Sequence, residues 1–368
     1  MAEAQILNFD VLLEIFSYLK IRERLRMELV CKQWRDASQF MLGSINTMDC
    51  LVHDDDACER FVEFAEEEIL YVWSNIETDL EKALKKFAHT LNKIIIMDDR
   101  RNAYMSRYFY KLLNKCTLLK YAEFECRHPR SLERFLKYLP TDNLKHLSIY
   151  FTPGSKHYRP LQDTLINEAL SKAKKLKSLN LNDVPVTVLQ SIGGTNTLKL
   201  LFIKIKSLPQ LNFHMNTLQN LETLVIECNQ FHSTAEITQL MKTCRQLHSV
   251  CIRSTNILPK TTLNEMMTLP NLQRLSLSTS SNGYESWHQF SNLVDIQISQ
   301  GEPFSLTKNQ ILSFLQRSKN LKTYDFSIRN DNRHFNKVIR EVGSHIGHEC
   351  LNYYPSQWTQ WRNTMFFL

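Results

Sequence analysis

A leucine pattern that recurs along the chain constrains its fold more than any other feature of the sequence. The pattern L-x-x-L-x-L, with any apolar residue allowed at the leucine positions, occurs ten times at intervals of 21 to 32 residues. The ten patterns begin at Leu91, Leu119, Leu144, Leu176, Leu198, Leu221, Leu247, Leu272, Leu293 and Leu321. Self-similarity at such a period is the signature of a repeat architecture, in which each unit buries its apolar face against its neighbours.

Segments between the patterns have a helical spacing of apolar residues. The clearest are residues 163–175, 233–244 and 307–318, where apolar residues recur every three or four positions. The end of each pattern alternates apolar residues with others, as a strand does. A strand followed by a helix, repeated, predicts an α/β solenoid. The alternative is an irregular α/β domain in which leucines recur by chance.

The spacing resembles that of leucine-rich-repeat proteins, and we assign about ten such repeats to residues 91–328. The resemblance implies a parallel sheet on the concave side and helices on the convex side. Cys116 and Cys244 lie three residues before a first leucine, where cysteine-containing repeats also carry cysteine. The Asn or Cys expected eight residues after the first leucine occurs only at Asn229. Other groups must therefore satisfy the backbone at most turns.

The first forty residues have a different, purely helical pattern. Apolar residues recur at helical spacing at Leu12, Ile15, Phe16 and Leu19, and again at Leu25, Leu29, Val30 and Trp34. Asn8 can cap the first helix, and one or two further helices must follow a bend near residues 20–21. A unit this small buries too little surface to be stable alone, so it either docks a partner or caps the domain that follows.

The segments "EIFSYL" (14–19) and "VCKQW" (30–34) stand at the separation found in an F-box, and residues 1–40 resemble that family. The resemblance implies binding to a Skp-type adaptor, which links the chain to the cullin and RING subunits of an SCF-type ubiquitin ligase. The residues that it assigns to the adaptor-binding surface and its support are Leu7, Leu12, Ile15, Phe16, Leu19, Val30, Cys31 and Trp34. Asn8 replaces the proline of the family, and Arg24 replaces an aliphatic residue beside Glu23.

Charge is distributed unevenly along the chain. Residues 41–90 hold twelve acids and four bases, whereas residues 91–368 carry a net charge of +15. The apolar residues Phe61, Phe64, Ile69 and Trp73 within the acidic segment indicate a folded helical connector over 41–90. The basic repeats raise the alternative of a nucleic-acid-associated repeat protein.

The charged residues at strand positions three, five and seven argue against nucleic acid. These positions face away from the leucines, toward the concave side. They contribute four bases against five acids, namely Lys93, Lys204, Arg253 and Arg274 against Glu123, Glu125, Glu227, Asp295 and Asp325. The excess of bases therefore falls on helices and connections. Apolar and aromatic residues at the same positions are typical of an exposed protein-binding centre. The substrate-binding residues we predict there are Tyr121, Tyr150, Leu200, Phe202, Val225, Arg253 and Arg274.

The sequence lacks the signatures of the common catalytic sites. It has no P-loop, dinucleotide-binding, nucleophile-elbow or H-E-x-x-H motif, and no C-x-x-C pair for a zinc-binding RING. His345, His348 and Cys350 could ligate a metal, but no distant fourth ligand is evident. We therefore predict a non-enzymatic subunit that needs no metal or cofactor and binds an unknown protein substrate. The alternative is an interaction scaffold unconnected with ubiquitin.

The remaining features bear on compartment and on the end of the chain. Nine cysteines without paired spacing suit reduced, buried thiols, and no apolar run approaches the length of a membrane span. These features predict a chain in the cytoplasm, the nucleus or both, away from membranes. Residues 329–368 are rich in aromatic residues and are predicted to cap the last repeat or to lie on the concave surface.

Overall fold

Two compact units, Met1–Thr197 and Leu198–Leu368, make up the computed structural model. The residues that the structure describes are 7–19, 21–43, 45–52, 61–65, 69–73, 77–98, 105–151, 163–183, 197–208, 218–231, 235–255, 258–278, 290, 292–300, 308–328 and 349–350. The predicted tail over 329–368 lies outside this set except for Glu349 and Cys350.

The first unit begins with three helices. They are α1 (Phe9–Ser17), α2 (Ile21–Met27) and α3 (Lys32–Leu42). Asn8 caps α1, because its side-chain oxygen accepts a hydrogen bond from the Asp10 amide at 3.2 Å. The predicted cap is therefore confirmed, and two helices follow the bend.

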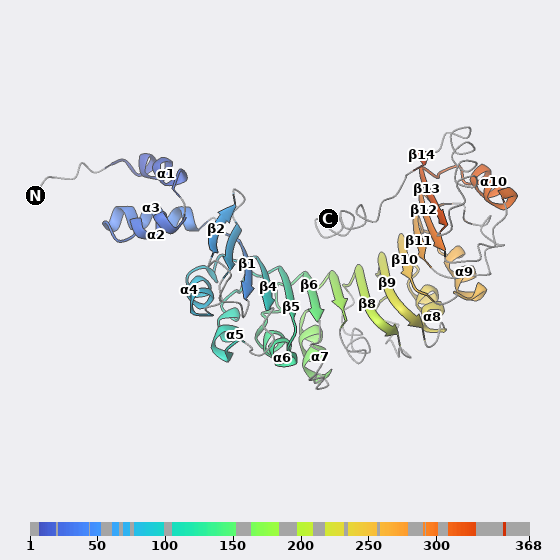
Figure 1. Ribbon diagram of the computed structural model, residues 1–368, viewed down its shortest axis with the longest axis horizontal. Coiled ribbons are helices and arrows are strands. Elements are labelled where there is room, and N and C mark those ends of the chain that lie inside the picture. The colour runs from blue at the N-terminus through green and yellow to red at the C-terminus, as the bar shows by residue number, and fades with distance from the viewer. Residues whose placement is uncertain are drawn as a thin grey trace, which may run out of the picture. The chain divides into compact units, whose positions relative to one another are not determined.

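Seven strands of the first unit lie side by side in a sheet, with helices along one side of it (Figure 1). Its strands are β1 (Thr47–Val52), β2 (Phe61–Ala65), β3 (Ile69–Trp73), β4 (Lys93–Asp98), β5 (Tyr121–Cys126), β6 (His146–Phe151) and β7 (Ser178–Asn182). They lie in the order β7-β6-β5-β4-β1-β3-β2, and all neighbours are parallel except β2 and β3. The helices are α4 (Glu77–Phe87), α5 (Arg107–Leu113), α6 (Pro129–Tyr138) and α7 (Asp163–Lys172).

The second unit repeats this arrangement with strands paired in sequence order (Figure 1). Its strands are β8 (Leu200–Leu208), β9 (Thr223–Phe231), β10 (Ser249–Arg253), β11 (Arg274–Ser278), β12 (Asp295–Gln300), β13 (Thr323–Ile328) and β14 (Glu349–Cys350). All of these neighbours are parallel. The helices are α8 (Ala235–Thr243), α9 (Lys260–Met267) and α10 (Lys308–Arg317).

Each of the ten predicted patterns forms a strand that begins two residues after its first leucine. The pattern at Leu176 is representative, because Leu176, Leu179 and Leu181 are all fully buried and β7 starts at Ser178. The three predicted helices are found as α7, α8 and α10. The α/β leucine-rich-repeat architecture predicted from the sequence is therefore confirmed within each unit.

A backbone ladder satisfies the amides at the starts of the strands. The carbonyl of Lys120, for example, accepts the amides of Lys145 at 2.8 Å and His146 at 3.0 Å. The same double acceptance recurs at the carbonyls of Asn46, Asn92, Lys145, Lys199, Glu222, His248, Gln273 and Val294. Because each carbonyl has two lone pairs, one row of backbone oxygens holds the next repeat without side-chain help.

The structure corrects the helical prediction for residues 61–65 and 69–73 of the connector. Residues 61–65 and 69–73 are the antiparallel strands β2 and β3, and β3 pairs with β1. The segments are short and rich in aromatic and branched residues, which favour strands, and a neighbouring strand supplies their backbone hydrogen bonds. Helix α4 does lie within the predicted connector. The boundaries predicted at residues 40 and 90 remain predictions.

The structure adds one strand of the array that the repeat search missed. Strand β1 pairs with β4 in the register that the later repeats use. Ile45, Met48 and Cys50 occupy the three leucine positions, and each is at most 3% exposed. All ten patterns that the search found begin with leucine, whereas this one begins with Ile45.

Two further observations complete the fold. Among the described residues, no helix is both long and apolar enough to span a bilayer. The seven cysteines whose side chains are described are unpaired, and six of them are buried.

Candidate functional site

Helix α1 carries two neighbouring apolar stripes, and the inner one forms the core of the N-terminal helices. Leu12 and Phe16 are fully buried with Ala37, and the Phe16 ring meets the Trp34 ring edge-on at a centroid distance of 5.5 Å. Leu19 packs against the same cluster. Leu12, Phe16, Leu19 and Trp34, four of the predicted adaptor-binding residues, thus lie in the core of the N-terminal helices and support their surface.

The outer stripe of α1 is exposed. Val11, Ile15 and Tyr18 are 41%, 38% and 81% exposed, and their spacing of four and three residues places them on one side of the helix. Further exposed apolar residues of the helical unit are Leu7, Leu29, Val30 and Phe40. Four of these seven were not among the adaptor-binding residues predicted from the sequence. They are Val11, Tyr18, Leu29 and Phe40. The sequence did contain a signal for the outer stripe of α1. Val11, Ile15 and Tyr18 recur at helical spacing, each one residue before Leu12, Phe16 and Leu19.

The other predicted adaptor-binding residues occupy the ends of helices. Leu7 precedes the α1 cap, and its carbonyl accepts a hydrogen bond from the Gln33 side chain at 2.6 Å. Cys31 is exposed at the N-cap of α3, next to Val30. The structure therefore places Leu7, Ile15, Val30 and Cys31 at the surface of the unit.

Arg24, which departs from the F-box pattern, caps α1 at its C-terminal end. Its guanidinium donates to the Leu19 carbonyl at 2.8 Å and to the Ser17 carbonyl at 3.2 Å. A cation at this end satisfies carbonyls that the helix leaves open and complements the helix dipole. Burial lowers the pKa of Arg24 from its ordinary value.

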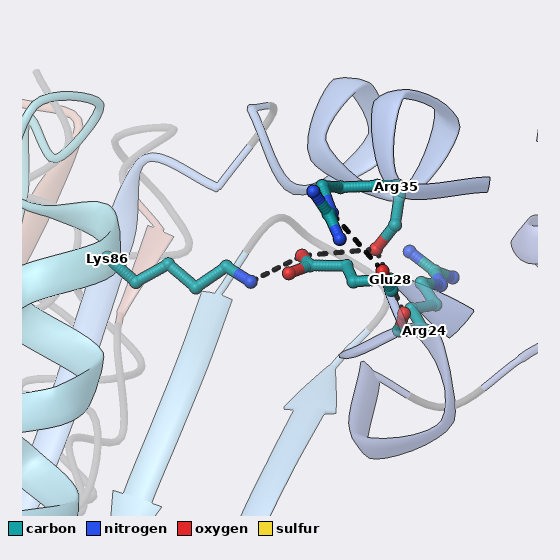
Figure 2. A network of polar contacts seen from close by, with 5 residues as sticks. Arg24, Glu28, Arg35 and Lys86 are labelled. Atoms are coloured by element: carbon teal, nitrogen blue, oxygen red, sulfur yellow. Dashed lines mark hydrogen bonds and ion pairs between the residues drawn. The ribbon is translucent and has the colours of Figure 1, made fainter. Parts of the chain in front are cut away.

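A polar network, which we call the clasp, joins the N-terminal helices to α4 (Figure 2). It consists of Arg24, Glu28, Arg35, Ser38 and Lys86. The Glu28 carboxylate pairs with the Lys86 ammonium and accepts a hydrogen bond from the Ser38 hydroxyl at 3.4 Å. The Ser38 hydroxyl also lies 2.9 Å from the Arg24 carbonyl, and Arg35 donates to the Glu28 carbonyl at 3.3 Å. The clasp therefore connects α2 and α3 to α4.

The strand face is the side of each sheet that carries positions three, five and seven of the repeats. In the second unit its centre is a cluster of Leu200, Phe202, Val225 and Cys251. We expected this cluster to be exposed, but Phe202, Val225 and Cys251 are only 8%, 6% and 2% exposed. The reason is the register: the three side chains stand side by side on paired strands and cover one another.

Ion pairs hold the two arginines predicted on this face. Arg253 contacts Glu227 at 3.1 Å, and Arg274 contacts Asp295 at 3.2 Å. Each pair joins neighbouring strands, and its side chains remain partly exposed. Two of the four bases counted at these positions are thus paired with acids counted there.

The strand face of the first unit is polar. The Tyr121 hydroxyl donates to the Glu123 carboxylate at 2.6 Å, and the Lys93 ammonium lies 4.8 Å from the centre of the Tyr121 ring. The Tyr150 hydroxyl accepts a hydrogen bond from Asn180 at 2.8 Å. Burial, and then the Glu123 charge, raise the pKa of Tyr121. Sequence reasoning named both tyrosines but missed Asn180, because a buried asparagine has no periodic signal.

Buried thiols dominate the cysteine chemistry. Burial raises the pKa of Cys116 and Cys244 to about 12 and that of Cys251 to about 11, so these thiols stay protonated near neutral pH. No cluster of metal-ligating side chains occurs among the described residues. Of the three residues considered for a metal, His345 and His348 lie outside the described residues, and Cys350 lies in β14.

A comparison with known protein families supports the resemblance of the N-terminal helices to an F-box. Residues 9–39 match the family model described as F-box-like. No curated protein sequence matches the chain.

Solved structures with leucine-rich repeats resemble the chain only distantly. A PEPR1–AtPEP1 crystal structure matches with a TM-score of 0.33 at 17% identity, covering 66% of this chain and 36% of that one. Internalin C2 from Listeria monocytogenes matches with a TM-score of 0.24 at 16% identity, covering 54% and 69%. The Toll–Spatzle complex of Drosophila matches with a TM-score of 0.26 at 9% identity, covering 73% and 51%. The fold assignment rests on the strand order and register described above.

Proposed function

We propose that this chain, in which an F-box-like segment precedes an array of leucine-rich repeats, is the substrate-recognition subunit of an SCF-type ubiquitin ligase. The F-box-like helices would bind a Skp-type adaptor, and the adaptor would bring the cullin and RING subunits. The repeats would bind a target protein for ubiquitination and degradation by the proteasome.

The observation that carries this proposal is the outer stripe of α1. Val11, Ile15 and Tyr18 are exposed although the helix already has a complete inner stripe for its own core. Exposed apolar side chains on a small helical unit are typical of a protein-binding surface. The F-box-like match covers this helix, and F-box segments bind Skp-type adaptors.

The chain would contribute binding rather than chemistry to such a complex. Six of its thiols are buried, and the described residues hold no metal-ligand cluster. Catalysis would come from the partner subunits, with no cofactor on this chain. We place the complex in the cytoplasm, the nucleus or both, following the cysteine pattern of the sequence.

Co-purification of the tagged full chain with the adaptor and cullin tests the proposal. Ile15→Asp together with Tyr18→Asp puts two charges on the outer stripe without touching the inner one. We expect at least a tenfold loss of adaptor binding, since a buried unpaired charge at an interface costs several kcal/mol. The matched control is Leu118→Asp, a residue of the repeats that is 50% exposed.

The outcomes separate the proposal from its alternatives. Adaptor and cullin should co-purify with the wild-type chain and with Leu118→Asp, and a thermal melt should show that all variants remain folded. A folded wild-type chain that binds neither protein would leave an interaction scaffold unconnected with ubiquitin. Binding of RNA or DNA that weakens steeply with salt would instead support a nucleic-acid-associated protein.

A further inference from the structure

The strand face of the first unit holds more hydrogen-bond acceptors than its own donors satisfy. Its central row runs Asp49, Ile95, Glu123, Ser148 and Asn180 across five paired strands. Parallel strands lie about 4.8 Å apart, so neighbouring side chains of such a row are within reach of one ligand. We call this row, with the position-seven residues Glu125, Tyr150 and Asn182, the acceptor face.

Carboxylates occupy one half of the acceptor face. Asp49 and Glu123 lie two strands apart in the central row, and Glu125 is exposed on the same strand as Glu123. Lys93 is the nearest base on these strands, and its ammonium sits over the Tyr121 ring. Burial, and then the Glu123 charge, raise the pKa of Asp49, while Lys93 lowers it. The two central carboxylates therefore repel each other, and a cation placed between them would relieve that repulsion.

Unpaired amide oxygens occupy the other half. Asn180 is fully buried, its amide nitrogen donates to Tyr150, and its side-chain oxygen has no hydrogen-bond partner. The side-chain oxygen of Asn182, two residues along β7, is also buried without a partner. A buried oxygen without a donor costs about 1 to 3 kcal/mol, so a donor from a ligand would be favoured there.

Three further bases lie at the start of the strands, and Arg127 directly follows β5, beyond Glu125. Lys120, Lys145 and Lys177 directly precede β5, β6 and β7. They lie next to position three, where His146 and the likewise unpaired Ser178 hydroxyl are found. A cationic ligand would therefore bind away from the strand starts, over the central row and the position-seven residues of β6 and β7.

We propose that the acceptor face binds an arginine side chain in an extended segment of the target protein. A guanidinium has five donors and no acceptor, so it matches a surface of carboxylates and amide oxygens. The Tyr150 ring would provide an aromatic surface for the planar group. This inference rests on the proposed function, since it names the kind of segment that the ligase subunit would recognise.

The test uses the full chain and an array of immobilised ten-residue peptides. Each peptide carries two arginines in a neutral background, and its matched partner carries citrulline, the uncharged isostere, at both positions. The wild-type chain should retain the arginine peptides at least about tenfold more strongly, as expected for hydrogen bonds between charged groups.

Two substitutions examine the acceptor face. Glu123→Gln keeps an oxygen for the Tyr121 hydroxyl but removes the charge, and Asp49→Asn does the same for the other central carboxylate. Each should abolish most of the preference for arginine over citrulline. The matched control is Glu133→Gln on α6, which removes one carboxylate from the helical side and should keep the preference. Thermal melts of all variants verify folding.

The results distinguish failure of this inference from failure of the proposed function. Equal retention of arginine and citrulline peptides by a chain that still binds its adaptor would overturn the arginine site alone. Preferential retention of acidic or phosphorylated peptides would also overturn it and would point to the lysines at the strand starts. Loss of preference in Glu133→Gln as well would show a nonspecific charge effect. Absence of adaptor binding would refute the ligase role whatever the array shows.

Discussion

Replacing Phe16 by alanine should unfold the F-box-like helices while leaving the repeats folded. Phe16 is fully buried and contacts the Trp34 ring edge-on. Truncating a buried phenylalanine costs about 3 to 5 kcal/mol. A unit of about 35 residues has a free energy of unfolding of only about 2 to 5 kcal/mol at the usual stability per residue. The substitution therefore removes most or all of the stability of this unit.

Hydrogen exchange of the full chain measures this effect locally. Amides of α1 and α3 should lose nearly all protection in Phe16→Ala, whereas amides of β5 and β6 should keep theirs. Adaptor binding should disappear together with the protection. The matched control is Tyr18→Ala, a truncation at an 81% exposed side chain, which should change stability by no more than about 0.5 kcal/mol. Native protection of α1 in Phe16→Ala would refute the division of α1 into an inner and an outer stripe.

Three further predictions concern the clasp, the thiols and the strand face. A double-mutant cycle of Glu28→Gln and Lys86→Met, followed by thermal unfolding, should give a coupling of about 1 kcal/mol or less, because both side chains are partly exposed. Among the described cysteines, Cys31 should react first with a thiol reagent, and Cys116, whose pKa burial raises to about 12, should react only after unfolding; early labelling of Cys116 would contradict the buried core. Asp49→Asn should raise the melting temperature near neutral pH, because burial raises the folded-state pKa of Asp49 and disfavours its charged form. That advantage should shrink as the pH falls through the raised pKa, where wild-type Asp49 becomes protonated, and an advantage independent of pH would show that its charge is not the cause.

Local periodicity in the sequence was sufficient to predict the repeats. Leu91 and Leu272 are buried, as their places in the pattern predict, and strand and helix periods differ enough to be told apart over a whole repeat. All ten predicted strands therefore begin at the same offset from their first leucine. The same reasoning failed over 61–73, where two short apolar segments fit either period and only pairing with each other and with β1 selects strands.

The tertiary structure, and not the local periodicity of the sequence, decided how far each apolar side chain is exposed. Phe202 and Ile15 are both apolar residues at regular positions, yet Phe202 is 8% exposed and Ile15 is 38% exposed. Neighbouring strands cover the first, and no element of the described residues packs over the second. Arg24 looked like a defect in an F-box pattern, but in the structure it caps α1. The sequence by itself determined which residues form strands and helices, because that depends on near neighbours in the chain. Only the tertiary structure decided which side chains remain available to a partner, because that depends on residues far apart in the chain.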